Sequence, residues 1–443
     1  MLRLPLELTL HVSAPLPLSP AGRARLVAWC LYDWAYGPFS TIVTTFVFAT
    51  YFVQAVAPDP IRGTAAWGAA QATAGVIIAL VAAPLGAIAD HGGRRQSMLR
   101  IATLILAGCI GGLWFIRPHP GSMLPALLLV GSATVASEVA LALYNAMLPE
   151  IAPLGRIGRV SGIAWGLGYL GGISGLLISL FVLVQPATPP FGLDRASAEP
   201  VRATTLVAAA WLLVFAAPLL LMRERAIHRL PWAQAARRGL AGLAALVHAA
   251  AREPVLVRFL VARMVYGDGL ITLFAFGAIF AAGTFGMTPQ QVLLLGIGLN
   301  VTGGIGALGF AMLEDRLGPR SVILTSLACL IGLGAAVLIV RSPTLFWIVA
   351  VPLGLFVGPA QSASRSLMAQ LAPADRRASF FGLYALSGRI TGFVGPASLA
   401  AVTAATGSQR AGMCVVLVLL GAGAWLLTGV QIASPALRTR TST

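Results

Sequence analysis

The stretch AIADHGGRRQS, residues 87–97, returns later in the chain as MLEDRLGPRSV, residues 312–322. Each copy lies between two long apolar runs, so both are expected to be short polar loops. Three residue pairs match at a constant spacing of 225 positions: Asp90 with Asp315, Gly93 with Gly318, and Arg95 with Arg320. A loop that recurs at about half the chain length indicates an internal repeat of the segments around it.

Two further matches extend this repeat in the same order. Residues 150–172 align with residues 370–392 at a spacing of 220, and the pair Tyr36 and Gly37 matches a Tyr-Gly pair 230 positions later. The three spacings differ only by what changes in loop length would produce. The chain is therefore expected to consist of two similar halves.

The composition of the chain predicts that these halves lie in a membrane. Of the 443 residues 58% are hydrophobic and 10% charged, and the mean hydropathy is +0.87. Soluble domains carry about 25% charged residues, and a helix needs roughly 20 apolar residues to cross a bilayer. Twelve apolar runs are predicted as transmembrane helices: about 26–56, 65–89, 98–116, 122–146, 160–184, 203–222, 255–284, 289–312, 321–341, 344–368, 379–405 and 411–432.

These runs predict an all-α polytopic membrane protein of two six-helix halves. The expected organisation is an N-terminal tail, a first half, a basic linker with an interfacial helix, a second half and a C-terminal tail: 1–25, 26–222, 223–253, 254–432 and 433–443. One chain completes this fold, so a monomer is the expected functional unit.

The net charge of +16 is explained by topology and does not indicate nucleic-acid binding. With the N-terminus placed inside, 21 arginines fall on the inner side and 6 on the outer side. This bias follows the positive-inside rule and predicts that both termini are cytoplasmic. A bacterial cytoplasmic membrane is the expected location, and membrane lipid is the expected surrounding.

Several function classes are excluded by residues that the sequence lacks. All 30 basic residues are arginine, so the lysine of a P-loop ATPase is absent. No H-E-x-x-H or G-x-S-x-G motif occurs, and the four cysteines fall in apolar runs without metal-ligand spacing. We expect no enzyme, no metal and no cofactor.

Six charged residues are predicted inside the apolar runs, where an ion is costly unless it is paired or functional. Three are acids and three are bases: Asp33, Glu138 and Asp268, with Arg258, Arg263 and Arg389. The repeat places Asp33 opposite Arg263, since each precedes a Tyr-Gly pair by three positions. With Glu138, these two are expected near one level in the cytoplasmic third, whereas Asp268 and Arg389 are expected nearer the middle.

Three interpretations of this charge cluster stay open. Asp33 or Glu138 could exchange protons, or Arg263 and Arg389 could bind an anionic group of a substrate while an acid binds its amine. The third is a fixed ion network that sets helix register, with Arg258 reaching the interface. Polar and aromatic residues that could line a central cavity, or only pack, complete the candidate site: Tyr36, Asn145, Trp165, Tyr169, Gln361 and Tyr384.

Two parallel six-helix repeats are the layout of the major facilitator superfamily, and GAIADHGGRR, residues 86–95, resembles its loop signature G-x-x-x-D-x-x-G-R-R. The match departs at His91 and Gly92, and the second copy has Ala311 where the leading glycine stands. The resemblance implies a charge latch at the cytoplasmic gate; the alternative is that the arginines only anchor topology. The implied gate residues are Gly86, Asp90, Gly93, Arg94, Arg95, Asp315, Gly318 and Arg320, with Arg365 as a gate or an inner anchor.

A narrower resemblance rests on WCLYDWAYGPFSTIVTTFVFATYF (29–52), YNAMLPEIAP (144–153), SGIAWGLGYLGG (161–172), RSLMAQLAP (365–373) and FFGLYALSGRITGFVGP (380–396). These strings look like the vacuole-effluxer-like branch, which includes fungal vacuolar amino-acid exporters. The resemblance implies secondary active efflux of a small polar or zwitterionic solute, amino acids first, with protons as a hypothetical coupling ion. The alternatives are an exporter of amphipathic compounds or lipids, and a transporter-like receptor without translocation.

Overall fold

The computed structural model describes residues 19–152, 156–222, 230–231, 233–238, 241, 252–287, 289–373, 376–392 and 394–430. Residues 1–18 of the predicted N-terminal tail and the whole predicted C-terminal tail lie outside these residues, and α1 begins at Pro20 within the predicted tail. Most of the predicted linker also lies outside them, although its residues 233–238 are helical. Within the described ranges the regular structure is entirely helical. This result agrees with the predicted all-α class.

Six helical rods make up the first part of the chain, and several of them change helix type or break along their length. Their elements are α1 (Pro20–Pro38), η1 (Phe39–Phe46), α2 (Phe48–Tyr51), η2 (Phe52–Val56), α3 (Pro60–Gly92), α4 (Arg95–Gly112), η3 (Leu113–Phe115), η4 (Pro120–Ser122), α5 (Met123–Ala146), α6 (Leu148–Ile151), α7 (Ile157–Ile178), η5 (Ser179–Val184), η6 (Pro190–Gly192) and α8 (Glu199–Leu220).

The second part repeats this pattern of rods. Its elements are α10 (Pro254–Phe285), α11 (Pro289–Leu317), α12 (Pro319–Ile339), α13 (Pro343–Ala350), η7 (Val351–Leu353), α14 (Gly354–Leu371), α15 (Arg377–Ile390), α16 (Val394–Thr406) and α17 (Gln409–Thr428). The predicted eleventh run thus contains two helices, α15 and α16, separated by a short break.

Ten stretches of described helix are long and apolar enough to cross a membrane. They coincide with ten of the twelve predicted runs. The other two runs correspond to α10 and to the α15–α16 pair, so the described helices are consistent with twelve spans.

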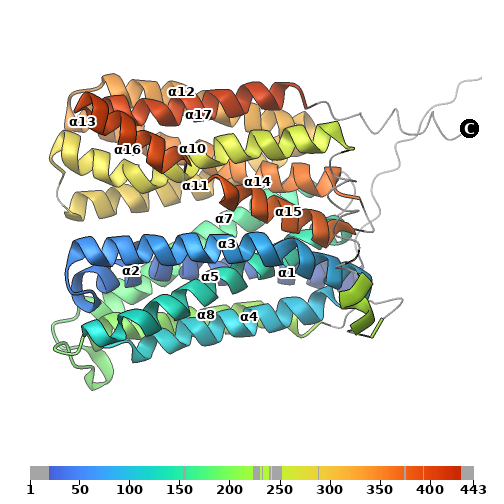
Figure 1. The fold of residues 1–443 in the computed structure, drawn as a ribbon, viewed down its shortest axis with the longest axis horizontal. Coiled ribbons are helices and arrows are strands. Elements are labelled where there is room, and N and C mark those ends of the chain that lie inside the picture. Colours follow the sequence, from blue (N-terminus) through green and yellow to red (C-terminus); the bar gives the residue numbers. More distant parts are fainter. Residues whose placement is uncertain are drawn as a thin grey trace, which may run out of the picture.

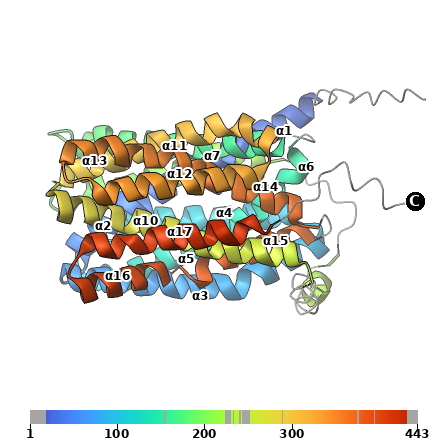
Figure 2. The same ribbon diagram turned by 90° about the horizontal axis from the view of Figure 1, so that it is seen from above.

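The elements of the two parts occupy separate regions of a bundle whose helices run along its longest axis. In Figure 1 the blue-to-green helices α1 to α8 lie below the yellow-to-red helices α10 to α17. Figure 2 shows the same bundle turned by 90°. We call the end where α1 begins and α17 ends the termini end; the loop between α3 and α4 lies there too (Figure 1).

Contacts between the two parts are concentrated on a few helices. α7 packs against α11 and α14, and α15 packs against α3 and α5. α16, the continuation of α15 away from the termini end, packs instead on α10 and α17 of its own part. The extensive packing of α3 on the second part is therefore made near the termini end.

Glycines allow α7 and α11 to approach closely. A Cβ atom built at Gly162 would lie 2.6 Å from the Cβ of Ala311 and 2.8 Å from the carbonyl oxygen of Ala307. A Cβ at Gly166 would lie 2.5 Å from Cγ of Leu308. The small residues in this region therefore serve close helix packing, because there is no room for larger side chains.

Replacing Gly162 by Ala should destabilise the protein by about 1–3 kcal/mol, because the new methyl group overpacks a tight crossing. The measurement is the thermal unfolding midpoint of the purified protein in detergent. Gly108→Ala in α4 is the matched control, since nothing lies within 4 Å of a Cβ atom at that position. An unfolding midpoint equally affected by both substitutions would contradict the close crossing.

Candidate functional site

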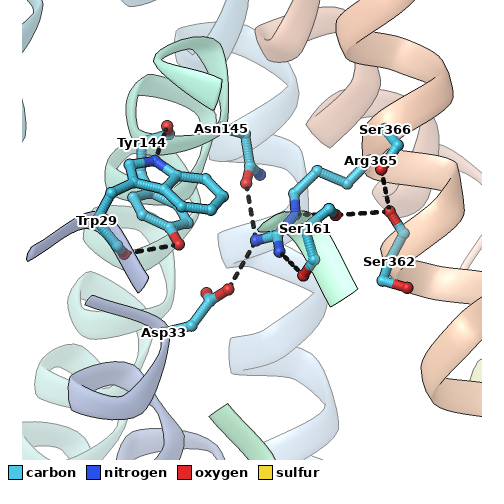
Figure 3. Close-up of polar contacts among 8 residues, drawn as sticks. All are labelled: Trp29, Asp33, Tyr144, Asn145, Ser161, Ser362, Arg365 and Ser366. Atoms are coloured by element: carbon cyan, nitrogen blue, oxygen red, sulfur yellow. Dashed lines mark hydrogen bonds and ion pairs between the residues drawn. The ribbon is translucent and has the colours of Figure 1, made fainter. Parts of the chain in front are cut away.

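An ion pair between the two parts of the chain forms the centre of the candidate site (Figure 3). An Nη atom of Arg365 on α14 lies 2.7 Å from a carboxylate oxygen of Asp33 on α1. Asp33 is 8% exposed and Arg365 is 3% exposed. Because both charges are buried, each depends on the other for compensation.

The remaining donors of Arg365 also reach the first part of the chain. Its Nε donates to the hydroxyl of Ser161 at 3.0 Å, an Nη donates to the carbonyl oxygen of Ser161 at 2.6 Å, and another contact reaches Oδ1 of Asn145 at 3.4 Å. Ser161 in turn donates to the carbonyl oxygen of Ser362 at 2.8 Å. A single guanidinium therefore links α14 to α1, α5 and α7 (Figure 3).

Aromatic rings surround the guanidinium of Arg365. Its Cζ lies 5.0 Å from the ring centroid of Trp29, 5.8 Å from that of Tyr144 and 5.7 Å from that of Trp165. Such placement of a cation near aromatic faces is favourable, more so away from water. The rings also fill the volume in which water could otherwise screen the ion pair.

Trp29 and Tyr144 are held in place by each other. The indole N–H of Trp29 donates to the carbonyl oxygen of Tyr144 at 3.0 Å, and the Tyr144 hydroxyl donates to the carbonyl oxygen of Trp29 at 3.0 Å. Their rings stack at 4.4 Å. This reciprocal contact fixes α1 against α5 and so sets the position of Asp33, one helical turn beyond Trp29.

Asp33 does not pair with Arg263, the residue that the repeat alignment places opposite it. Arg263 on α10 lies with its guanidinium 3.7 Å from the ring centroid of Tyr384, and it donates to the carbonyl oxygen of Tyr384 at 3.3 Å and to Ser387 at 3.2 Å. Repeat-equivalent positions meet only near the symmetry axis that relates the halves. Instead, α1 packs on α7 and α8, and α10 packs on α17.

Near the axis such equivalents do meet. Asn145 and Arg365 are 220 positions apart, the spacing of the aligned segments, and they contact each other. The repeat-equivalent of the Asp33–Arg365 pair is therefore Arg263 with Asn145. In that pair Arg263 stands in place of the acid, and Asn145 stands in place of the arginine. Within the described part of the chain no carboxylate forms an ion pair with Arg263.

The other predicted site residues are distributed around this centre. Trp165 contacts Arg365 as described, and Tyr169 packs over the second part, where a Cβ atom at Gly303 would lie 3.1 Å from its ring. Asp268 is 3% exposed on α10. Tyr36, Glu138 and Gln361 are half-buried on α1, α5 and α14, and the side chain of Arg389 lies outside the described residues.

A second layer of contacts joins the two parts at the termini end. A carboxylate oxygen of Asp90 accepts from the backbone N–H of Ser379 at 2.8 Å and from its hydroxyl at 2.7 Å. Arg95 pairs with Asp90 at 3.0 Å and also with Glu150. Ser379 lies in the first turn of α15, where a helix favours a negative charge.

The second copy of the loop makes the equivalent contact in the opposite direction. Asp315 accepts from the backbone N–H of Arg159 at 3.0 Å and lies 3.5 Å from its guanidinium. Arg159 lies in the first turn of α7. Since Arg159 and Ser379 are 220 positions apart, the two aspartates hold repeat-equivalent helix starts.

Not every predicted gate residue bridges the two parts. Arg320 donates to the carbonyl oxygens of Leu427 at 3.3 Å and Thr428 at 2.5 Å, so it caps α17 within the second part. Arg94 donates to the carbonyl oxygen of Leu230 at 3.4 Å. Gly86 is buried in α3.

The two loop glycines have a conformational role. Gly93 and Gly318 adopt positive φ angles of 59° and 79°, which allow the sharp turns after α3 and α11. The loops thereby place Asp90 and Asp315 beside the other part of the chain.

Sequence reasoning missed Ser161, Ser379 and Glu314. Ser379 could have been found from the repeat, because it matches Arg159 at the same spacing of 220. Glu314 directly precedes Asp315, but the sequence does not show which of the two acids faces solvent. The structure buries Glu314 to 2% exposure.

A pocket between the two parts lies on the side of the ion pair away from the termini end. It is lined by Thr41, Phe46, Ile173, Leu176, Ile297 and Asn300, from η1, α7 and α11. Its lining is mainly apolar, with Thr41 and Asn300 as the polar members.

Comparison with known proteins gives a consistent family. The model described as Vacuole effluxer Atg22 like matches residues 152–436. An uncharacterized MFS-type transporter, YxiO of Bacillus subtilis strain 168, is 24% identical over 408 residues, which cover 91% of this chain and 94% of that protein. Autophagy-related protein 22 of Eremothecium gossypii is 24% identical over 337 residues, covering 72% of this chain and 62% of that protein.

Solved structures agree on the fold. The major facilitator superfamily transporter FucP in the outward conformation has a TM-score of 0.73 at 12% identity, covering 94% of this chain and 99% of that one. The human organic anion transporter MFSD10 has a TM-score of 0.65 at 17% identity, covering 92% and 100%. The predicted membrane-transporter fold is confirmed.

Replacing Asp33 by Asn should destabilise the protein by about 3–5 kcal/mol, because it leaves the Arg365 cation buried without a counter-ion. Adding Arg365→Gln should restore part of the loss, so that the double variant is more stable than the sum of the two single effects. Thermal unfolding of the purified variants measures this coupling.

Asp59→Asn provides the control, since Asp59 pairs with Arg62 at 3.4 Å in an exposed position. It should change stability by at most about 1 kcal/mol. If Asp33→Asn is no more harmful than Asp59→Asn, the buried pair does not hold the two parts together.

Asp90→Asn and Asp315→Asn should each weaken the termini end by about 1–2 kcal/mol and raise its open population by about 5- to 30-fold. The measurement is the labelling rate by an impermeant maleimide of Ser362→Cys, a buried position in the interface, in a background without the four native cysteines. Arg320→Gln, which loses bonds within one part only, should leave the labelling rate unchanged. Equal acceleration by all three would show that the aspartates act through general stability.

Proposed function

The chain belongs to the Vacuole effluxer Atg22 like family of major facilitator superfamily transporters, and on this premise we propose that it exports a small polar or zwitterionic solute, amino acids first. The observation that carries the proposal is the buried Asp33–Arg365 pair between the two parts of the chain. An ion pair across a moving interface holds one conformation closed and must be separated to reach the other. Alternating access requires such a contact.

We propose that residues 26–222 and 254–432 move as two six-helix units, with the termini end facing the cytoplasm. Closure at that end is supported by the contacts of Asp90 with Ser379 and of Asp315 with Arg159. The Asp33–Arg365 pair adds a second barrier deeper in the bundle. Both barriers open when the units rock apart at the termini end.

The substrate carboxylate is assigned to Arg263. Its guanidinium is half-buried and is held over the ring of Tyr384 and by Ser387, and no described carboxylate pairs with it. A planar guanidinium fixed in this way suits two-pronged binding of a carboxylate. The buried acid Asp268, five residues further along α10, is the proposed partner for the substrate amine.

Coupling to protons follows from the cost of separating Asp33 from Arg365. Leaving a buried carboxylate without its partner costs several kcal/mol until water reaches it, and binding a proton removes that charge. A proton entering on Asp33, with Glu138 on the neighbouring α5 as a second acceptor, would lower the barrier to opening. Inward proton flow would then drive outward movement of solute.

Transport should be tested by counterflow in liposomes containing the purified protein, with single amino acids as solutes. We expect exchange of at least one amino acid, and a loss of about 2–5 kcal/mol in solute binding for Arg263→Ala, because an aligned charge is removed. Arg258→Ala is the matched control, since Arg258 donates to the carbonyl oxygen of Gly429 at an exposed position. It should retain exchange.

Imposing a proton gradient should accelerate net efflux of the same solute. An efflux rate that does not depend on the proton gradient would reject proton coupling and leave the transport proposal intact. Solute binding without counterflow would instead indicate a receptor and reject transport.

A further inference from the structure

Glu314 is a buried acid at the interface of the two units that the proposed mechanism does not use. It lies near the termini end of α11 and is 2% exposed. A Cβ atom built at Gly158 would lie 2.7 Å from its carboxyl carbon, so the backbone of α7 lies directly against the carboxyl group. Its Oε1 has no hydrogen-bond partner among the described residues.

The charged groups around Glu314 do not pair with it. On its own helix, Asp315 is paired with Arg159 at the start of α7 and lies near Arg156. From α14, Arg365 is near enough to interact electrostatically, but its bonds go to other residues. Ser366 on α14 hydrogen-bonds to the carboxyl group, but Oε1 stays unsatisfied. A buried carboxylate with one unsatisfied oxygen and no counter-ion carries a large desolvation cost.

Arg365 would lose its counter-ion and its other hydrogen-bond partners when the units separate. Among the described residues its hydrogen-bond partners are Asp33, Asn145 and Ser161. All three belong to the first unit, although Arg365 itself lies on α14 of the second. Rocking the units apart would remove these partners together. Glu314 then remains beside it, because α11 and α14 pack against each other within the second unit.

We propose that Glu314 holds a proton while the termini end is closed and releases it when that end opens, after which its carboxylate replaces Asp33 as the counter-ion of Arg365. The O–H bond of the carboxyl group breaks, and the proton passes to water entering between α7 and α11. Asp33, separated from Arg365, faces the same water and returns to it any proton taken up during opening, so Glu314 alone changes its proton count between the closed and the open state. Opening at this end is therefore favoured by high pH on that side and opposed by low pH.

This inference rests on the alternating movement of the proposed function, but not on the identity of the solute. The experiment therefore measures the movement itself. Spin labels at Ala24 on α1 and Gln370 on α14, both exposed and in different units, report the separation at the termini end. Raising the pH from about 5.5 to about 8.5, a range spanning shifted buried acids, should increase the long-distance population of the parent protein several-fold.

Glu314→Gln keeps the shape of the protonated side chain and cannot release a proton. We expect it to retain the short distance across the whole pH range. Asp315→Asn is the matched neighbouring variant; it should shift the population toward the long distance while keeping the pH response. Infrared difference spectra of the parent protein should show loss of a protonated carboxyl band on opening, which Glu314→Gln lacks.

The proposal is overturned if Glu314→Gln keeps the pH response of the parent, or if the parent shows none. Should the variant not fold, the infrared spectra of the parent decide: a protonated carboxyl that persists on opening rejects proton release. Failure of amino-acid counterflow alone would reject the substrate assignment and leave this pH response in place.

Discussion

The structure depends on one constraint, which is that two ions buried in an apolar bundle must stay paired. Asp33 and Arg365 meet at 2.7 Å, and they come from different halves of the chain. The surroundings meet the geometric needs of this pair. Trp29 and Tyr144 fix the helix that carries the acid, and the backbone and hydroxyl of Ser161 orient the guanidinium. Closing the bundle therefore brings the two charges together, so that each compensates the other.

The two loop aspartates reinforce this closure by a different kind of bond. Asp90 and Asp315 each accept a backbone N–H in the first turn of a helix from the other half. Such bonds are partly exposed and are made without a strict partner side chain, so they can re-form easily as the halves move. The deep ion pair is costlier to break and sets the conformational preference, whereas the loop contacts seal the end.

Much of this arrangement could be predicted from sequence, because hydrophobic length and internal repetition are properties of single segments. The apolar runs, the repeated loops and the close packing of glycines near Gly162 all follow from such local patterns. Pairing between segments is different. Repeat alignment says that Asp33 and Arg263 are equivalent, but equivalent residues touch only near the axis, as Asn145 and Arg365 do. Likewise, the adjacent acids Glu314 and Asp315 differ in burial because of how α7 packs against them, which the sequence does not show.

The hydrogen bonds of Arg365 also bear on how the two halves evolved. Among the described residues, its hydrogen bonds reach only the other half, and at the equivalent position that half carries Asn145. Two copies of the first half would leave each acid facing an amide, and two copies of the second half would bring arginines together without an acid. Divergence after duplication has therefore made the halves complementary and no longer interchangeable. A half exchanged for that of a distant relative would bring its own charge pattern to the interface, so the two must evolve as a matched pair.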